Sequence, residues 1–126
     1  MSVVESWVER AEYDLTTARA MLDTHRYLYV AFCCQQAVEK ALKALIVKQT
    51  SAIPPRIHNL LRLADLAGLE LTEERAEMFA TLSEYYIESR YPTELALLEK
   101  RLNRALARNA LEESEKVIQW LFSMLT

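Results

Sequence analysis

The chain has 126 residues, a formal net charge of −3 and a single glycine, Gly68. This length suits one domain with one hydrophobic core. One glycine is too few for a glycine-rich phosphate loop, and it disfavours folds built from many tight hairpins. The excess of acidic residues, with a pI near 5.5, argues against attraction of the whole chain to nucleic acid or an anionic membrane. Binding to either would require a local basic patch.

The first half of the chain predicts two long helices. Residues 3–23 and 27–49 each carry apolar side chains at spacings of three and four, which is the pattern of an amphipathic helix. Ser2 or Ser6 is placed to cap the first of them. Residues 24–26 interrupt the pattern, and so short a connection makes the two helices antiparallel.

A loop and a short helix are predicted next. Residues 50–57 contain the Pro54-Pro55 pair, which excludes a continuous helix there. A short helix is expected from about residue 58 to residue 67. Gly68 follows it, as a glycine often does at the end of a helix.

The last third of the chain predicts two more helices. Thr72 precedes two glutamates and is a suitable N-cap for a helix that ends near Arg90, before Tyr91-Pro92. Residues 93–100 are ambiguous, because they fit either a loop or an early turn of the last helix. The final helix is expected from about residue 103 to residue 124.

Together these elements predict a single domain, residues 1–126, with an all-α fold: an antiparallel bundle of four main helices plus one short helix.

Cys33 and Cys34 are neighbours whose side chains diverge on a helix, so we expect reduced core residues and no disulfide. No metal-ligand pattern is present, and no cofactor is expected. The N-terminus lacks a signal-peptide pattern, and the uncharged run 27–38 is too short to span a bilayer, which predicts a cytoplasmic protein.

The second helix carries a polar stripe at spacings i, i+3, i+4 and i+7, formed by Gln36, Glu39, Lys40 and Lys43. Two interpretations remain open. The stripe is either a solvated face with a Glu39–Lys43 ion pair or one wall of a groove. In a groove, the lysines would meet phosphate and the glutamine would read a base edge.

Three further residues are candidates for a site. His58 follows the Pro-Pro loop, where it either caps the short helix or packs against the loop, or else contributes to a site. Arg90 and Tyr91 end the fourth helix. The arginine either serves the helix dipole or lies over a phosphate, with a tyrosine stacked on a base.

In combination these segments resemble the HEPN domain family (higher eukaryotes and prokaryotes nucleotide-binding). Four segments, in the family's order and spread over the whole chain, carry the resemblance: Trp7-x3-Ala11-x2-Asp14, Gln36-x2-Glu39-Lys40-x2-Lys43, His58-x-Leu60-x2-Leu63 and Tyr86-x3-Arg90-Tyr91-Pro92. The resemblance implies a helical bundle related to the helical domain of aminoglycoside nucleotidyltransferases.

The same resemblance implies a homodimer with a polar groove that takes a nucleotide or RNA. Many members of the family partner a separate minimal nucleotidyltransferase, commonly as a toxin–antitoxin pair, so such a partner is expected and a membrane is not. Carried over residue by residue, the expected ligand-binding residues are Gln36, Glu39, Lys40, Lys43, His58, Arg90 and Tyr91.

The chain departs from the ribonucleases of the family. Those enzymes carry Arg-x4–6-His, whose histidine serves acid–base cleavage at a ribose 2′-hydroxyl. No histidine follows Arg90, and Arg19-x5-His25 fits the spacing at the end of the first helix, in the wrong element. We therefore assign no catalytic residue and expect a binding module. The alternatives are a metal-independent endoribonuclease toxin that uses His25 or His58, or a structural scaffold without a ligand.

Overall fold

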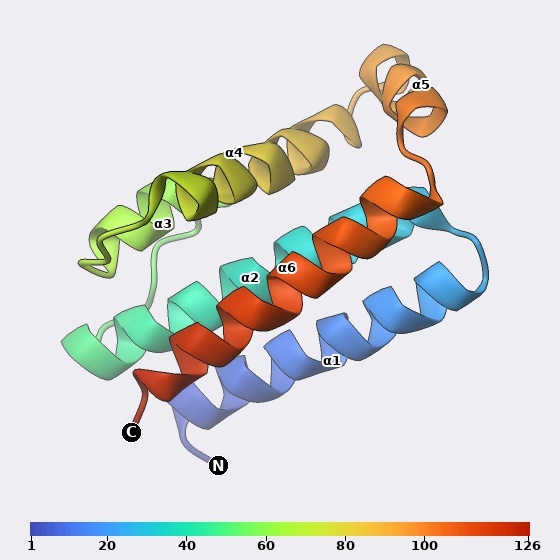
Figure 1. Ribbon diagram of the computed structural model, residues 1–126. Coiled ribbons are helices and arrows are strands. Elements are labelled where there is room, and N and C mark those ends of the chain that lie inside the picture. The colour runs from blue at the N-terminus through green and yellow to red at the C-terminus, as the bar shows by residue number, and fades with distance from the viewer.

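The computed structural model describes residues 1–126 as six α-helices with no strand (Figure 1). In chain order the helices are α1 (Val3–Asp23), α2 (Tyr27–Thr50), α3 (Leu60–Leu66), α4 (Glu73–Glu88), α5 (Pro92–Arg101) and α6 (Arg104–Ser123). The long helices α1, α2 and α6 lie side by side, and α4 covers α2 from another side. The predicted all-α, antiparallel bundle is confirmed.

The expected antiparallel pair of α1 and α2 forms as the sequence predicts. The Ser2 side chain accepts a hydrogen bond from the Glu5 backbone N–H at 3.1 Å and so caps α1. The turn between the helices includes His25, whose φ of 61° lies in the left-handed region. One face of α1 is buried against the rest of the bundle through Ala11, Leu15, Ala18 and Leu22.

Helix α2 is the centre of the fold, because it contacts all five other helices. Between Ala37 and Val47 every residue except Lys40 is buried. A helix surrounded in this way leaves little water for charged side chains, so each charge on it needs a protein partner. Glu39 and Lys43, at 4% and 6% exposure, are two such charges.

Helix α3 begins two residues later than the sequence predicts. Asn59 is the N-cap, and its side-chain oxygen accepts a hydrogen bond from the Arg62 backbone N–H at 3.2 Å. His58 therefore lies in the preceding loop and outside the helix. The other end agrees with the prediction, since Gly68 follows the helix with a φ of 70°.

The ambiguous segment, residues 93–100, is neither a loop nor an early turn of the last helix. It belongs to a separate helix, α5, with Pro92 at its first position and Tyr91 as an extended N-cap residue. Leu102, with a ψ of 96°, separates α5 from α6. The bundle thus has two short helices, and α4 ends at Glu88, two residues earlier than expected.

No helix of the structure is both long enough and apolar enough to cross a membrane.

The cysteines are unpaired, with Cys34 fully buried in the core and Cys33 at its edge. Burial raises the pKa of the Cys33 thiol from 9.0 to about 11 and that of Cys34 to about 12. Both residues therefore remain thiols at neutral pH.

These pKa shifts predict a loss of stability at high pH. Unfolded thiols ionise near pH 9, whereas the folded ones hold their protons, so the unfolded state releases more protons above pH 9. The free energy of unfolding should therefore fall as the pH rises from 9 towards the folded pKa values. Urea denaturation of the wild type and of a Cys33→Ala, Cys34→Ala variant measures this fall. Equal pH slopes for the two proteins would contradict the prediction.

Candidate functional site

The candidate site is organised around the carboxylate of Glu39, which is buried on α2. Its Oε2 accepts a hydrogen bond from Lys43 Nζ at 3.0 Å, and its Oε1 accepts one from Gln35 Nε2 at 3.0 Å. His58 Nδ1 lies 2.9 Å from the same Oε1. Because an ionised carboxylate can only accept hydrogen bonds, His58 Nδ1 carries the hydrogen in this arrangement.

Two features of the chain bring these groups together. Gln35, Glu39 and Lys43 are spaced four residues apart, which places them on one face of α2. The loop after α2 returns to this face, where Gln35 Nε2 also donates to the His58 backbone oxygen at 2.9 Å. The next helix is fixed as well, since the Leu60 backbone N–H donates to Ser83 Oγ at 3.0 Å.

The His58 ring is held on one edge and open on the other. Its side chain is 47% exposed, although its partner Glu39 is almost completely buried. Tyr86 of α4 lies against the ring, with the two centroids 4.8 Å apart. Nothing in the protein is hydrogen-bonded to Nε2. A histidine with Nδ1–H on a carboxylate presents Nε2 to a ligand as an acceptor when neutral and as a donor when protonated.

Tyr86 links His58 to Arg90. Arg90 lies one turn further along the chain, and its Nη1 donates to the Tyr86 hydroxyl at 2.6 Å. The guanidinium carbon lies 5.4 Å from the centre of the Tyr86 ring, within the range of a cation–π contact. Phe32 of α2 stacks on the same ring at 5.9 Å. No carboxylate pairs with Arg90, so most of its N–H groups remain available.

A small hollow lies beside the arginine. Its volume is about 190 Å³, and its lining residues are Leu28, Tyr29, Phe32, Ser89, Arg90 and Leu95. Pockets that enclose a whole small-molecule ligand usually measure about 300–1,000 Å³. The hollow therefore accommodates one flat apolar group next to a guanidinium, and the remainder of a larger ligand would extend outside it.

The structure brings five of the seven predicted site residues into this network. Lys43 and His58 each contact Glu39 directly, and Arg90 reaches His58 through Tyr86. Gln36 joins them through Gln35, because its Nε2 donates to Gln35 Oε1 at 2.7 Å.

The other two predicted residues lie apart from the network. Lys40 extends towards α1 and forms an ion pair with Asp14. Tyr91 is 57% exposed at the start of α5, and its side chain makes no hydrogen bond or ring contact. Since Lys43 is paired with Glu39 as well, Arg90 is the only cation of the predicted set without a carboxylate partner.

The predicted set of site residues leaves out three residues of the network, Gln35, Phe32 and Tyr86, although Tyr86 begins one of the segments that carry the family resemblance. Each of the three lies four residues before a predicted site residue on its own helix, so helical spacing could have identified them. Spacing does not reveal that Phe32 meets Tyr86, because that contact depends on how α4 packs against α2. No three His, Cys, Asp or Glu side chains lie close enough together to hold a metal ion.

Comparison with known proteins identifies the family to which this fold belongs. The HEPN domain model matches residues 4–124. The crystal structure of TT1696 from Thermus thermophilus is similar, with 28% identity over 98% of both chains and a TM-score of 0.81. That of ST0689, an archaeal HEPN homologue, shares the fold with 24% identity over 100% of both chains and a TM-score of 0.80. No curated protein matches. Because the family match spans nearly every residue, the chain belongs to the HEPN domain family.

Proposed function

We propose that this HEPN protein is a nucleotide- or nucleic-acid-binding module that dimerises and partners a separate minimal nucleotidyltransferase, as in a toxin–antitoxin pair. The observation that carries the binding proposal is the state of Arg90. The Arg90 side chain is exposed and has no carboxylate partner, and it is oriented by Tyr86, whose ring also lies against His58. A planar guanidinium of this kind suits the oxygens of a phosphate.

The surroundings of Arg90 provide the other contacts that a nucleotide needs. The Nε2 of His58, which has no hydrogen-bond partner in the protein, can donate a second hydrogen bond to a phosphate when the ring is protonated. Phe32 and Tyr29 line the hollow beside the guanidinium and offer flat surfaces for a base. Glu39 and Lys43 are too buried to touch a ligand, and in this proposal they hold His58 in place.

Dimerisation is supported by apolar side chains next to the hollow. HEPN domains commonly dimerise. Here Ile87, Tyr91 and Leu97 are 56%, 57% and 59% exposed around the junction of α4 and α5. A second copy that covers this region would bury them and would enlarge a hollow that is too small for a whole nucleotide. The nucleotidyltransferase partner rests on the family resemblance, and co-purification with the product of a neighbouring gene tests it.

Isothermal titration with ATP tests the binding proposal. Arg90→Ala should weaken ATP binding about tenfold or more, because a hydrogen bond to a charged group contributes about 1.5–3 kcal/mol. Arg108→Ala removes another exposed arginine, on α6, and should leave the affinity within about twofold. If ATP, GTP and a short RNA all fail to bind the folded wild type, the proposal is wrong and a scaffold without a ligand is favoured.

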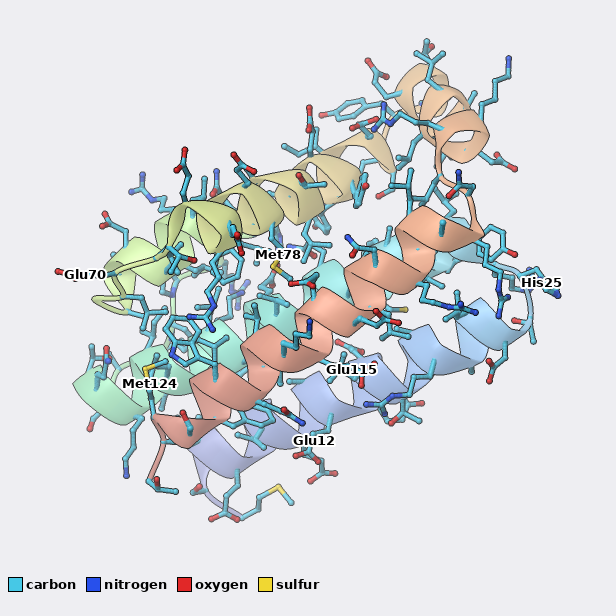
Figure 2. All side chains as sticks on the ribbon, viewed as in Figure 1. Glu12, His25, Glu70, Met78, Glu115 and Met124 are labelled. Atoms are coloured by element: carbon cyan, nitrogen blue, oxygen red, sulfur yellow. The ribbon has the colours of Figure 1, made fainter.

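One observation favours a second candidate, a metal-independent endoribonuclease. Glu39 holds His58 with Nε2 free, which is the arrangement of a general base, and Arg90 contacts the same Tyr86 ring that lies against His58. His25 lies at the α1–α2 turn (Figure 2), where its Nδ1 is 2.9 Å from the Tyr27 hydroxyl, and it forms no hydrogen bond with Glu39, His58 or Arg90. Under this alternative the protein cleaves RNA without metal and His58→Ala abolishes cleavage. Bound RNA that stays intact supports the binding module.

A further inference from the structure

Helices α4 and α6 are separated by a second, larger groove. Its volume is about 380 Å³. The apolar floor consists of Met78, Leu82, Tyr85, Leu106 and Ala110. Figure 2 shows Met78 between the two helices. Leu106 is 41% exposed, so the floor is open to solvent.

The groove is long enough for a helix. Its α4 wall extends from Glu74 to Tyr85, which corresponds to about 17 Å or three helical turns. Near the start of α4, Arg75 closes the space between the helices, because its guanidinium lies 4.0 Å from the centre of the Trp120 ring. What remains is an elongated channel with an apolar floor and polar sides between two helices, which is a shape that suits helix-in-groove recognition.

The rim of the groove carries charge of one sign. Glu74 and Glu77 of α4 and Glu113 of α6 line it, and no lysine or arginine does. Glu74 and Glu77 form no ion pair, and Glu113 has only an exposed contact of 3.4 Å with Lys116. The carboxylates are therefore available to a positively charged partner.

We propose that this groove binds an amphipathic helix of a partner protein, with an apolar stripe flanked by lysine and arginine. Apolar residues at i, i+3 or i+4 and i+7 of such a helix would follow the floor, and the flexible Met78 side chain can adapt to them. The basic flanks would meet the glutamates of the rim. Charge complementarity thus selects this occupant over an acidic or a purely apolar helix.

The groove is separate from the candidate nucleotide site. Tyr85 lines the groove, whereas Tyr86 contacts His58 and Arg90. Neighbouring residues on a helix point about 100° apart, so the two sites lie on different sides of α4. The inference therefore goes beyond the proposed function and does not depend on it.

The test uses a fluorescein-labelled synthetic helix of about four turns, with leucines at helical spacing and lysines on both flanks. Fluorescence anisotropy with the full chain should show saturable binding. Glu77→Lys should weaken binding about tenfold or more, because it places a like charge against the basic flank. Glu12→Lys makes the same change on the exposed side of α1 and should alter binding by less than about twofold (Figure 2). ATP binding should not change in either variant.

Thr81→Trp provides a second variant that fills the groove without changing its charge, and it should also weaken peptide binding about tenfold or more. No binding at about 100 μM peptide overturns the proposal. So does equal binding of a scrambled peptide, or equal weakening by Glu12→Lys, since both indicate non-specific attraction. If Glu77→Lys instead changes the mass of the protein in solution, the groove is occupied by a second copy and the proposal is wrong.

Discussion

Replacing Glu39 with alanine is expected to lower the free energy of unfolding by about 3–5 kcal/mol. The reason is that Lys43, the partner of Glu39, remains in the variant. Lys43 is only 6% exposed and would keep a buried positive charge with no carboxylate near it. Gln35 and His58 would each lose a hydrogen-bond acceptor as well. Since domains of this size are stable by about 5–15 kcal/mol, urea denaturation followed by circular dichroism should resolve the change clearly.

Two controls separate the cost of leaving Lys43 without a partner from the contribution of the Glu39–Lys43 ion pair to the free energy of unfolding. A Glu39→Met, Lys43→Met double variant removes both charges, and it should recover most of the stability, because apolar side chains often replace a buried ion pair well. Glu113→Ala breaks the exposed pair with Lys116 and should cost less than about 1 kcal/mol. If Glu39→Ala costs no more than Glu113→Ala, the buried charge on Lys43 has found another partner or water.

The helices that could be predicted from the sequence are those set by local signals. The periodicity of α1 and α2 survives in the structure because their apolar positions are the ones that the bundle buries. Caps are local too: the Ser2 and Thr72 hydroxyls lie next to the amides that they satisfy.

The elements that could not be predicted depend on competing local signals. Pro92 is compatible with the end of one helix and with the first position of the next, and here it begins α5. For the short helix, both His58 and Asn59 are polar residues ahead of an apolar run. Only the observed hydrogen bond identifies Asn59 as the cap and leaves His58 free to face Glu39.

The polar stripe of α2 shows why a site is harder to predict than a helix. Spacing correctly places Glu39, Lys40 and Lys43 on neighbouring positions of one helix. It does not reveal that α1 covers one flank, so that Lys40 pairs with Asp14, while His58 and α4 cover the other. Residue spacing also does not indicate how deeply a side chain is buried. An i, i+4 ion pair was one open interpretation, but the sequence suggested a solvated pair, and the structure buries it.

Tyr86 is the residue on which the ligand site depends most, because it contacts both groups that would meet a phosphate. Tyr86→Ala should remove the ring against His58 and the hydroxyl that orients Arg90. We expect the affinity for ATP to fall about 100-fold or more, since two ligand contacts lose their orientation. Stability should fall by about 2–3 kcal/mol with the ring contacts to Phe32 and His58.

The Tyr86→Phe variant separates the effect of Tyr86 on the orientation of Arg90 from its effect on the free energy of unfolding. The ring contacts remain, so the free energy of unfolding should change by less than about 1 kcal/mol, whereas Arg90 loses its 2.6 Å hydrogen bond and ATP binding should weaken about tenfold. Tyr13→Ala removes an exposed tyrosine on α1 and serves as the matched control, with both quantities unchanged. Calorimetric titration and urea denaturation on the same samples provide the two readouts. If Tyr86→Phe binds ATP as tightly as Tyr13→Ala does, Arg90 does not need Tyr86 to reach its ligand.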